Sequence, residues 1–303
     1  MSAGFVTSEG QIIYSNMDHW WSRKFKESGL IGGSTVHYFE PGPWDEQYQE
    51  LEDPIPGLTP WSTSNVKAKV GVVTGNHSVF HEPRGDGYCV RMETNLKKVV
   101  VLGVVNVKAI ASGSIFTGGM VDPITDPEPP RRNTLMGIPF EHAPTAMQFD
   151  YKTIVGRNRQ RATGGLRVRD IDGRDKAEAY VILQNRVEDN DGNLTEKRVG
   201  TGWVRFDETT PDWVNDYQLK INYGDITDSN VFESYMGLID DKDPFYSYNS
   251  KGDVVQYLES GWSSNPDDVT HIIVVFSASY EGGEYKGSPE SKFWIDNVKF
   301  IYE

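Results

Sequence analysis

The sequence is poor in cysteine, in basic charge and in long apolar runs. Its one cysteine, Cys89, excludes an internal disulfide framework and a zinc site built from several thiolates. Forty-four acidic against 30 basic residues give a formal net charge of -14. This charge repels phosphate backbones, so we expect no nucleic-acid partner. The longest apolar run, residues 99–105, is far shorter than the roughly 20 residues that span a bilayer, so we expect no transmembrane segment.

The composition nevertheless predicts a folded protein. Hydrophobic residues make up 37% of the chain and aromatic residues 12%, enough for a packed core. The first four residues lack the basic region and apolar stretch of a secretory signal. That start is compatible with a cytosolic protein or with a mature chain whose leader has been removed.

Helical periodicity is scarce, and short segments rich in β-branched and aromatic residues predict an all-β protein. The clearest predicted strands cover residues 179–184, 199–206, 271–279 and 293–302. Asp-Gly and Gly-Gly dipeptides predict tight turns at residues 172–173, 191–192 and 282–283. We expect one large β-sandwich domain over residues 1–303, with residues 1–15 as a possible amino-terminal extension and 121–139 as an alternative domain boundary.

Two proline-rich stretches, residues 39–60 and 121–139, predict long surface loops. Proline removes a hydrogen-bond donor from a β-ladder and fixes φ, which disfavours strands there. Long loops on a rigid sheet scaffold commonly carry binding function. The loop aromatics are therefore candidates for ligand contact.

Acidic side chains near turns are candidate calcium ligands. Residues 170–175 and 189–193 resemble part of an EF-hand loop, but no helical pattern flanks them and hairpin turns are the favoured interpretation. Asp296 differs because it lies inside an apolar strand, where an unpaired carboxylate is costly. If it faces inward, it needs a cation or hydrogen-bond donors; facing solvent is the alternative.

Nucleophilic catalysis has little support in the sequence. No Gly-x-Ser-x-Gly elbow is present, and His77 and His81 lack the helical context in which residues four apart share a face. Carboxylates are the plentiful catalytic groups, and glycoside hydrolysis needs two of them at a suitable separation. The candidates among aromatics or glycines are Glu40, Asp45, Glu46, Glu82 and Glu281.

Aromatic residues are the more distinctive feature. Sugar rings pack flat C–H faces on aromatic rings, and their hydroxyls need polar partners, so saccharide sites combine both kinds of residue. The candidate ligand-binding residues are Trp44, Trp61, Asn65, Arg84, Trp262, Tyr280, Glu281 and Tyr285, with Tyr246 and Tyr248 as further ring candidates. The alternative for each ring is that it fills the core of the sandwich.

Several separated blocks resemble the putative carbohydrate metabolism domain family of Bacteroidetes. The carboxy-terminal segment 271–302 resembles the family's ending, and it contains Glu-Gly-Gly-Glu-Tyr and Phe-Trp-Ile-Asp-Asn-Val. The other matching blocks, in order, are Trp61–Asn65, Gly87–Thr94, Ile115–Gly118 and Gly137–Phe140. The resemblance covers most of the chain.

This resemblance implies a jelly-roll sandwich of two antiparallel sheets with long loops, similar to galactose-binding-like carbohydrate-binding modules. It also implies an extracytoplasmic location, in the periplasm or at the cell surface, among other glycan-utilisation proteins. In related modules a calcium ion ties the last strand to the amino-terminal segment. Asp296 matches the last-strand position, and Asp18 is the amino-terminal counterpart, although its surroundings depart from the usual Phe-Glu.

Three functions follow as hypotheses. The first is a carbohydrate-binding or glycan-handling module that binds an oligosaccharide or polysaccharide. The second is a glycoside hydrolase with a carboxylate pair, and the third is a structural or adhesive surface domain. Enzymatic activity is left open with binding favoured, and a structural calcium ion is the one expected cofactor, with no organic cofactor.

Overall fold

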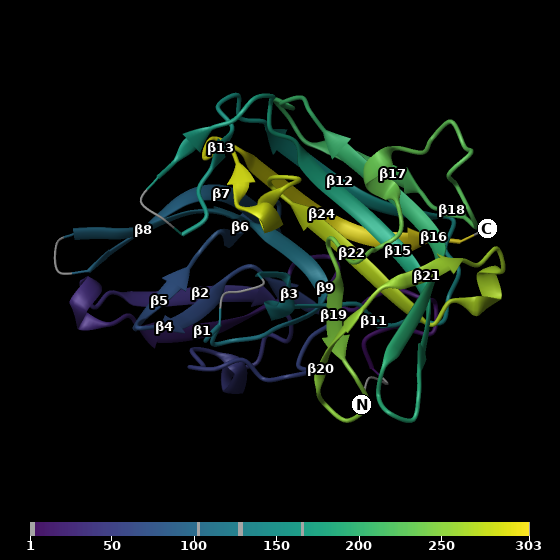
Figure 1. Cartoon of the computed structure of the whole chain (residues 1–303), viewed down its shortest axis with the longest axis horizontal. Helices are drawn as coiled ribbons and strands as arrows, with labels where there is room; N and C mark the ends of the chain where they lie inside the picture. Colours follow the sequence, from purple (N-terminus) through teal and green to yellow (C-terminus); the bar gives the residue numbers. More distant parts are fainter. Residues whose placement is uncertain (1–3, 102–103, 127–129, 165–166, 303) are drawn as a thin grey trace.

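The computed structural model describes residues 4–101, 104–126, 130–164 and 167–302 (Figure 1). In these ranges the chain forms strands and short 3-10 helices and no α-helix. The all-β prediction is confirmed. None of the described helices has the length and apolar character needed to cross a membrane. The apolar run 99–105 includes residues 102 and 103, which lie outside the described ranges.

The larger sheet contains three of the four predicted strands. Its strands run in the order β18 (Asn222–Tyr223), β16 (Leu194–Phe206), β15 (Ala177–Glu188), β22 (His271–Ser277), β9 (Ser114–Met120), β10 (Thr134–Met136), β19 (Phe245–Tyr248) and β20 (Val254–Tyr257). Beside them, β3 (Trp61–Thr63) pairs with β9, β11 (Ile138–Pro139) with β22, and β21 (Glu259–Trp262) with β16. Most pairs are antiparallel. The pairs β10–β19 and β16–β21 are parallel and depart from the purely antiparallel prediction.

The second sheet contains the fourth predicted strand, β24. Its order is β17 (Val214–Lys220), β12 (Ala146–Ile154), β24 (Lys292–Ile301), β7 (Gly87–Val101) and β6 (Val79–Arg84), and β8 (Val104–Ser112) pairs with β7. Smaller sheets are formed by β1 (Trp20–Lys26) with β2 (Thr35–Pro41), by β4 (Val66–Val70) with β5 (Val72–Asn76), and by β14 (Arg169–Asp170), β13 (Gln160–Arg161) and β23 (Lys286–Gly287). The described 3-10 helices are η1 (Gly29–Ile31), η2 (Glu46–Tyr48), η3 (Pro130–Asn133), η4 (Ser234–Met236), η5 (Pro266–Asp268) and η6 (Gly282–Glu284).

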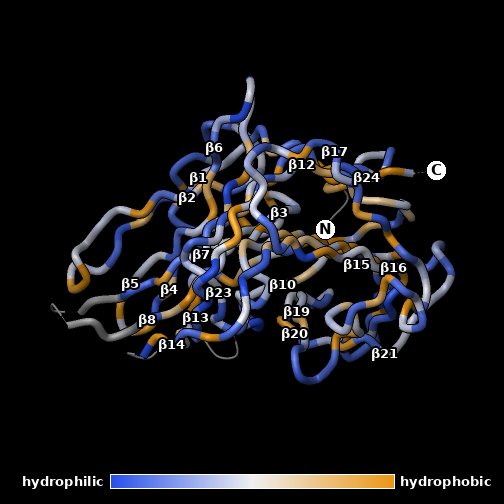
Figure 2. Tube along the Cα trace, turned by 90° about the horizontal axis from the view of Figure 1, so that it is seen from above, coloured by the Kyte–Doolittle hydropathy of each residue, from blue (hydrophilic) through white to orange (hydrophobic). Residues whose placement is uncertain are grey.

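Strand β15 is buried on both faces. Its side chains point alternately into two separate hydrophobic cores. Ala179, Val181 and Leu183 face the second sheet and join the main core with Phe149 and Phe293. The side chains between them point to the opposite face, because successive residues in a strand alternate. Seen from above, β12, β17 and β24 form one layer, β15 and β16 the next, and β19, β20 and β21 lie beyond it (Figure 2).

The second, smaller core lies on that opposite face. Tyr180 and Ile182 pack there with Ile239, Phe245 and Tyr257. These partners come from β19, β20 and the irregular chain before them. The larger sheet is therefore covered on both sides, which explains the nearly continuous apolar sequence of β15.

The loop predictions are partly confirmed. Residues 42–60 are irregular apart from η2 and short bridges. Residues 121–139 instead include β10 and β11, because the stretch between its prolines pairs with β9 and β22. In the predicted turn at 191–192, Asp189 accepts backbone hydrogen bonds from Asp191 and Asn193, and Gly192 has a φ of 91°. This confirms the hairpin interpretation of that segment.

The amino-terminal segment packs against the last strand. Ile12 and Met17 lie in the main core. The Gln11 side chain exchanges two 2.8 Å hydrogen bonds with the backbone of Phe300, and the Tyr302 hydroxyl donates to Gly10. In the described residues from 4 onward, this segment is thus part of the sandwich.

A buried acid, Glu196, lies on β16 beneath the smaller core. Its side chain is 0% exposed and is 3.1 Å from Arg186. Burial raises the pKa of Glu196 to about 8, against the opposing effect of Arg186, and the nearby Glu259 adds to the increase. The folded chain therefore holds a proton on this group in a pH range where the unfolded chain has lost it.

We expect the folded state to lose stability as pH rises from the ordinary Glu pKa of 4.5 to about 8. In this window the native state binds more protons than the unfolded state. The free energy of unfolding of the wild type, relative to Glu196→Gln, should fall by about 1.4 kcal/mol per pH unit. Urea unfolding at several pH values measures it, with exposed Glu46→Gln as the control. Parallel pH profiles for wild type and Glu196→Gln would contradict this assignment.

Candidate functional site

A cavity of about 340 Å³ lies on the outer face of the larger sheet, away from the main core. Its floor is formed by the outward-facing side chains of β15 and β16. The irregular segment around η4, the start of β19, Arg131 in η3 and residues 280–284 around η6 form its walls. Segments distant in sequence therefore converge on one hollow.

The floor follows from strand register. Glu178 pairs with Arg205, and Tyr180 with Trp203, across the antiparallel ladder of β15 and β16. Directly opposed residues place their side chains on the same face. Because Ala177, opposite Phe206, faces the main core, these four neighbouring residues point outward into the cavity.

Aromatic rings dominate the floor and one wall. Tyr180 and Trp203 are stacked with ring centroids 4.1 Å apart, and Tyr235 meets Trp203 edge-on at 5.8 Å. The Arg205 guanidinium lies 3.9 Å from the Tyr235 ring centroid and 4.5 Å from that of Tyr280. These contacts fix the orientation of the rings at the edge of the smaller core.

Glu178 is the buried acid of the cavity. Its Oε1 accepts hydrogen bonds from Trp203 Nε1 at 2.9 Å and from Arg205 Nε at 2.7 Å. No described residue donates to Oε2. Burial raises the pKa of Glu178 above its ordinary value, although the Arg205 charge opposes the increase. Oε1 is therefore bound by two donors, whereas Oε2 has no hydrogen-bond donor among the described residues.

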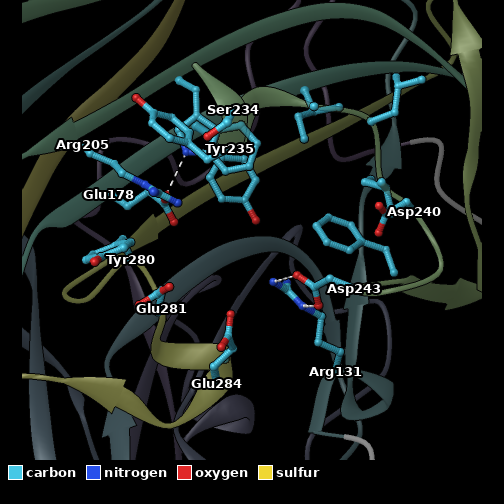
Figure 3. Close-up of a pocket in the computed structure, with 18 of the residues that line it drawn as sticks. Arg131, Glu178, Arg205, Ser234, Tyr235, Asp240, Asp243, Tyr280, Glu281 and Glu284 are labelled. Atoms are coloured by element: carbon cyan, nitrogen blue, oxygen red, sulfur yellow. Dashed lines mark hydrogen bonds and ion pairs between the residues drawn. The ribbon is translucent and has the colours of Figure 1, made fainter. Parts of the chain in front are cut away.

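Two further acids face the same centre from η6 (Figure 3). Glu281 is ion-paired with Arg159 and lies 3.5 Å from Lys286. Glu284 is 2.7 Å from the same Lys286 nitrogen. Figure 3 shows Glu178, Glu281 and Glu284 directed toward one open space, with the Arg131–Asp243 pair on another side.

The structure places two of the sequence-predicted ligand residues, Tyr280 and Glu281, in this cavity. The others are outside its lining. Trp44 is 67% exposed on the loop after β2, and Trp262 lies on β21 with its ring 5.6 Å from Arg198. Tyr285 ends η6 with a φ of 58°. Of the further ring candidates, Tyr246 is buried and Tyr248 is half exposed.

Two predicted residues belong to the interior instead. Trp61 is 0% exposed, and its indole nitrogen donates to the Ile13 carbonyl, so no ring face is open to a sugar. Asn65 is also 0% exposed and bonds the backbone of Ser78 and Val79. Trp61 lies on β3, which pairs with β9, and Asn65 follows that strand, so both side chains lie inside the sandwich rather than on its surface.

Asp296 faces inward and is met by hydrogen-bond donors. Arg84 Nη1 lies 2.6 Å from Asp296 and 2.8 Å from Asp150, and the Arg84 guanidinium stacks on Trp213 at 3.8 Å. Burial raises the pKa of Asp296, hydrogen bonds from Arg84 and the Asn297 backbone lower it, and Asp18 raises it further. Arg84, predicted to bind ligand, thus neutralises a buried carboxylate pair.

Asp18 lies close to this cluster, as the predicted pairing with Asp296 requires. Its Oδ1 accepts from the Tyr88 backbone at 3.1 Å, and its Oδ2 accepts from Asn16 at 2.6 Å. Over the described ranges, no group of three or more His, Cys, Asp or Glu side chains is arranged to hold a metal ion. The residues as arranged do not fit a calcium ion, because Arg84 already lies within hydrogen-bond distance of Asp296 and supplies the positive charge there.

Sequence reasoning missed Glu178, Trp203 and Arg205, which lie within or beside strands that it predicted correctly. A usable signal was present. These residues occupy alternate positions in β15 and β16, out of phase with the small apolar residues that face the main core. Charged and aromatic side chains in that phase indicate a second face that does not belong to the main core. Arg131 and Tyr235 carried no such signal because they lie in short 3-10 helices outside the strands.

Comparison with solved structures finds proteins of similar fold. One is a putative glycoside hydrolase from Bacteroides thetaiotaomicron, with a TM-score of 0.53 and 16% identity, covering 94% of this chain and 71% of that chain. Another is a putative glycoside hydrolase from Bacteroides vulgatus, with a TM-score of 0.46 and 18% identity, covering 75% of this chain and 78% of that chain. At this identity the first likeness shows the fold alone.

Comparison of the sequence with curated proteins gives no match. A protein family does match: the profile of the putative carbohydrate metabolism domain covers residues 38–301. This range includes both sheets and every residue that lines the cavity. The chain therefore belongs to the putative carbohydrate metabolism domain family.

Proposed function

We propose that this protein binds a saccharide in the cavity on the outer face of β15 and β16. The observation that carries the proposal is that aromatic rings and a carboxylate with one oxygen free of donors line the same cavity of about 340 Å³. Ring faces accept the C–H faces of a sugar, and the polar groups fix its hydroxyls. Membership in a carbohydrate metabolism family supports the same ligand class.

The charge of the cavity disfavours an anionic sugar. Each described guanidinium group in the lining has a carboxylate partner, in the pairs Arg131–Asp243, Arg198–Glu259 and Arg205–Glu178. No arginine in the lining is left with an uncompensated charge for an anionic ligand. The groups without described partners include Glu178 Oε2 as an acceptor and the terminal nitrogens of Arg205 as donors. A hydroxyl both donates and accepts, and so suits this mixture.

A purely structural or adhesive role is less well supported. That alternative expects a protein without a concave aromatic cluster, whereas Tyr180, Trp203, Tyr235 and Tyr280 line one cavity. An extracytoplasmic location, in the periplasm or at the cell surface beside other glycan-utilisation proteins, belongs to the same proposal. Its support is the family's link to carbohydrate metabolism.

Hydrolysis is a second candidate function for the same site. Glycosidases use two carboxyl groups, one of them kept protonated by its environment. Glu178 has a raised pKa because of burial, and Glu281 and Glu284 face the same space (Figure 3). Glu178 is therefore the candidate general acid and an η6 carboxylate the candidate partner.

We expect neutral oligosaccharides to bind with micromolar to millimolar affinity, and Trp203→Ala or Tyr235→Ala to weaken binding about tenfold or more. Each substitution removes a ring from the cavity. Isothermal titration with neutral, uronate and amino-sugar oligosaccharides measures it. Trp44→Ala, outside the lining, is the control and should bind like wild type. Loss of binding in Trp44→Ala together with normal binding in Trp203→Ala would place the site elsewhere. A binding heat observed only with uronate oligosaccharides would refute a neutral sugar as the ligand.

If the cavity is catalytic, Glu178→Gln should lower turnover at least a hundredfold while sugar affinity changes only a few-fold. The amide keeps the shape of the side chain but supplies no acidic proton. Activity should fall as pH rises through the raised pKa of Glu178, because a general acid must be protonated. A reducing-sugar assay across a polysaccharide panel tests this. No turnover with wild type on any substrate argues for binding alone.

For Asp296, we expect a chelator to leave the melting temperature of the wild type unchanged. Calcium was predicted because a buried Asp296 needs a positive charge nearby, and Arg84 already supplies that charge. Arg84→Met should lower the melting temperature by several degrees, because it leaves two buried carboxylates uncompensated. Thermal melts with and without EDTA measure both effects. A lower wild-type midpoint in EDTA would instead support the calcium prediction, since a ligand bound only to the folded state raises the midpoint.

A further inference from the structure

The ion pair between Arg198 on β16 and Glu259 on β21 is the most deeply buried charge pair beside the cavity. Both side chains are 0% exposed. Arg198 donates from Nε to Glu259 Oε1 at 2.7 Å and from Nη2 to Oε2 at 2.5 Å. The contact is bidentate, which fixes the relative orientation of the two planar groups.

The pair also holds the backbone of the segment after η4. Arg198 donates to the carbonyls of Met236 at 3.4 Å and Gly237 at 3.2 Å. Glu259 Oε2 accepts from the Ile239 N–H at 2.9 Å, and the Glu259 N–H donates to the Ile239 carbonyl at 2.9 Å. Two charged side chains and one backbone amide thus bind consecutive peptide groups of residues 236–239.

These contacts replace a strand pairing that the segment lacks. Residues 237–244 are irregular and belong to no β-ladder. Backbone groups in a buried irregular segment need partners from elsewhere. Four successive residues of the segment, 237–240, line the cavity, and so does Tyr235, two residues before them. The pair therefore determines where this wall of the cavity lies.

Stability alone is a poor explanation for such a pair. Removing two charges from water is costly, and well-packed apolar residues of similar size often give equal or greater stability. What apolar residues cannot supply is directed hydrogen bonds to Met236, Gly237 and Ile239. The arrangement is therefore suited to specifying geometry.

We propose that Arg198 and Glu259 are positioning residues that hold residues 236–239 as a wall of the cavity and so set its affinity for a saccharide. Glu259 lies outside the lining and acts through the backbone that it binds. The affinity part of the proposal rests on the proposed function. The wall-positioning part is measured without any ligand.

The experiment compares three forms of the chain by amide hydrogen exchange and by titration with a neutral oligosaccharide. In Glu259→Gln, exchange in residues 236–239, read at the Ile239 amide whose N–H donates to Glu259, should be at least tenfold faster than in wild type. Affinity should fall about tenfold or more. The matched control is Glu40→Gln, in the buried Arg23–Glu40 pair, which is not in the cavity lining. It should lower the melting temperature but leave exchange at 236–239 and affinity unchanged.

The double variant Arg198→Met/Glu259→Leu separates positioning from stability. It removes both charges, so its melting temperature should be closer to wild type than that of Glu259→Gln. Exchange at 236–239 should stay fast and affinity low, because the directed bonds are gone. If Glu259→Gln fails to fold, Arg198→Lys replaces it, and exchange at residues 236–239 should likewise be faster than in wild type.

Wild-type exchange and affinity in the double variant would overturn the proposal. So would equal exchange at residues 236–239 in Glu259→Gln and Glu40→Gln. A wild-type chain that binds no saccharide would refute the proposed function instead, and the exchange comparison then decides the positioning role by itself.

Discussion

The burial of β15 on both faces over residues 177–184 is the constraint on which the rest of the structure depends. One face of β15 joins the main core through Ala179, Val181 and Leu183, and the other carries Tyr180 and Ile182 into the smaller core. A strand buried on both sides cannot point its charged residues to open water. Every charge on the outer face must therefore find a partner inside the protein.

That requirement organises the polar groups of the outer face. Glu178 is paired with Arg205, and Arg198 with Glu259. An unpaired buried charge costs far more than a paired one, so these side chains occur in couples along the same face. Where such an ion pair lines the cavity, some of its donor and acceptor atoms have no hydrogen-bond partner among the described residues. The same pairing of buried charges thus fixes the position of the polar groups in the cavity.

The loops contribute differently from what their composition indicates. Proline-rich chain at 121–139 is drawn into the sheet as β10 and β11, and Arg131 just before β10 reaches the cavity. Trp61 and Asn65 fold inward, whereas Tyr280 and Glu281 stay at the rim. Loop membership alone does not separate these cases. The difference is set by which sheet face each loop crosses, and that depends on pairings between strands far apart in sequence.

The sequence by itself determined the class of the fold, because period-two alternation and turn residues are local properties of the chain. It also indicated the 271–302 segment, with Tyr280 and Glu281, and singled out Asp296 as a carboxylate on an apolar strand. Only the tertiary structure decided that Arg84 meets Asp296, and that Glu178, Tyr235 and Arg131 share one cavity. Those groups lie on separate strands and loops, and their meeting is fixed by sheet register and by the packing of two cores. Both are non-local, so no window of sequence contains them.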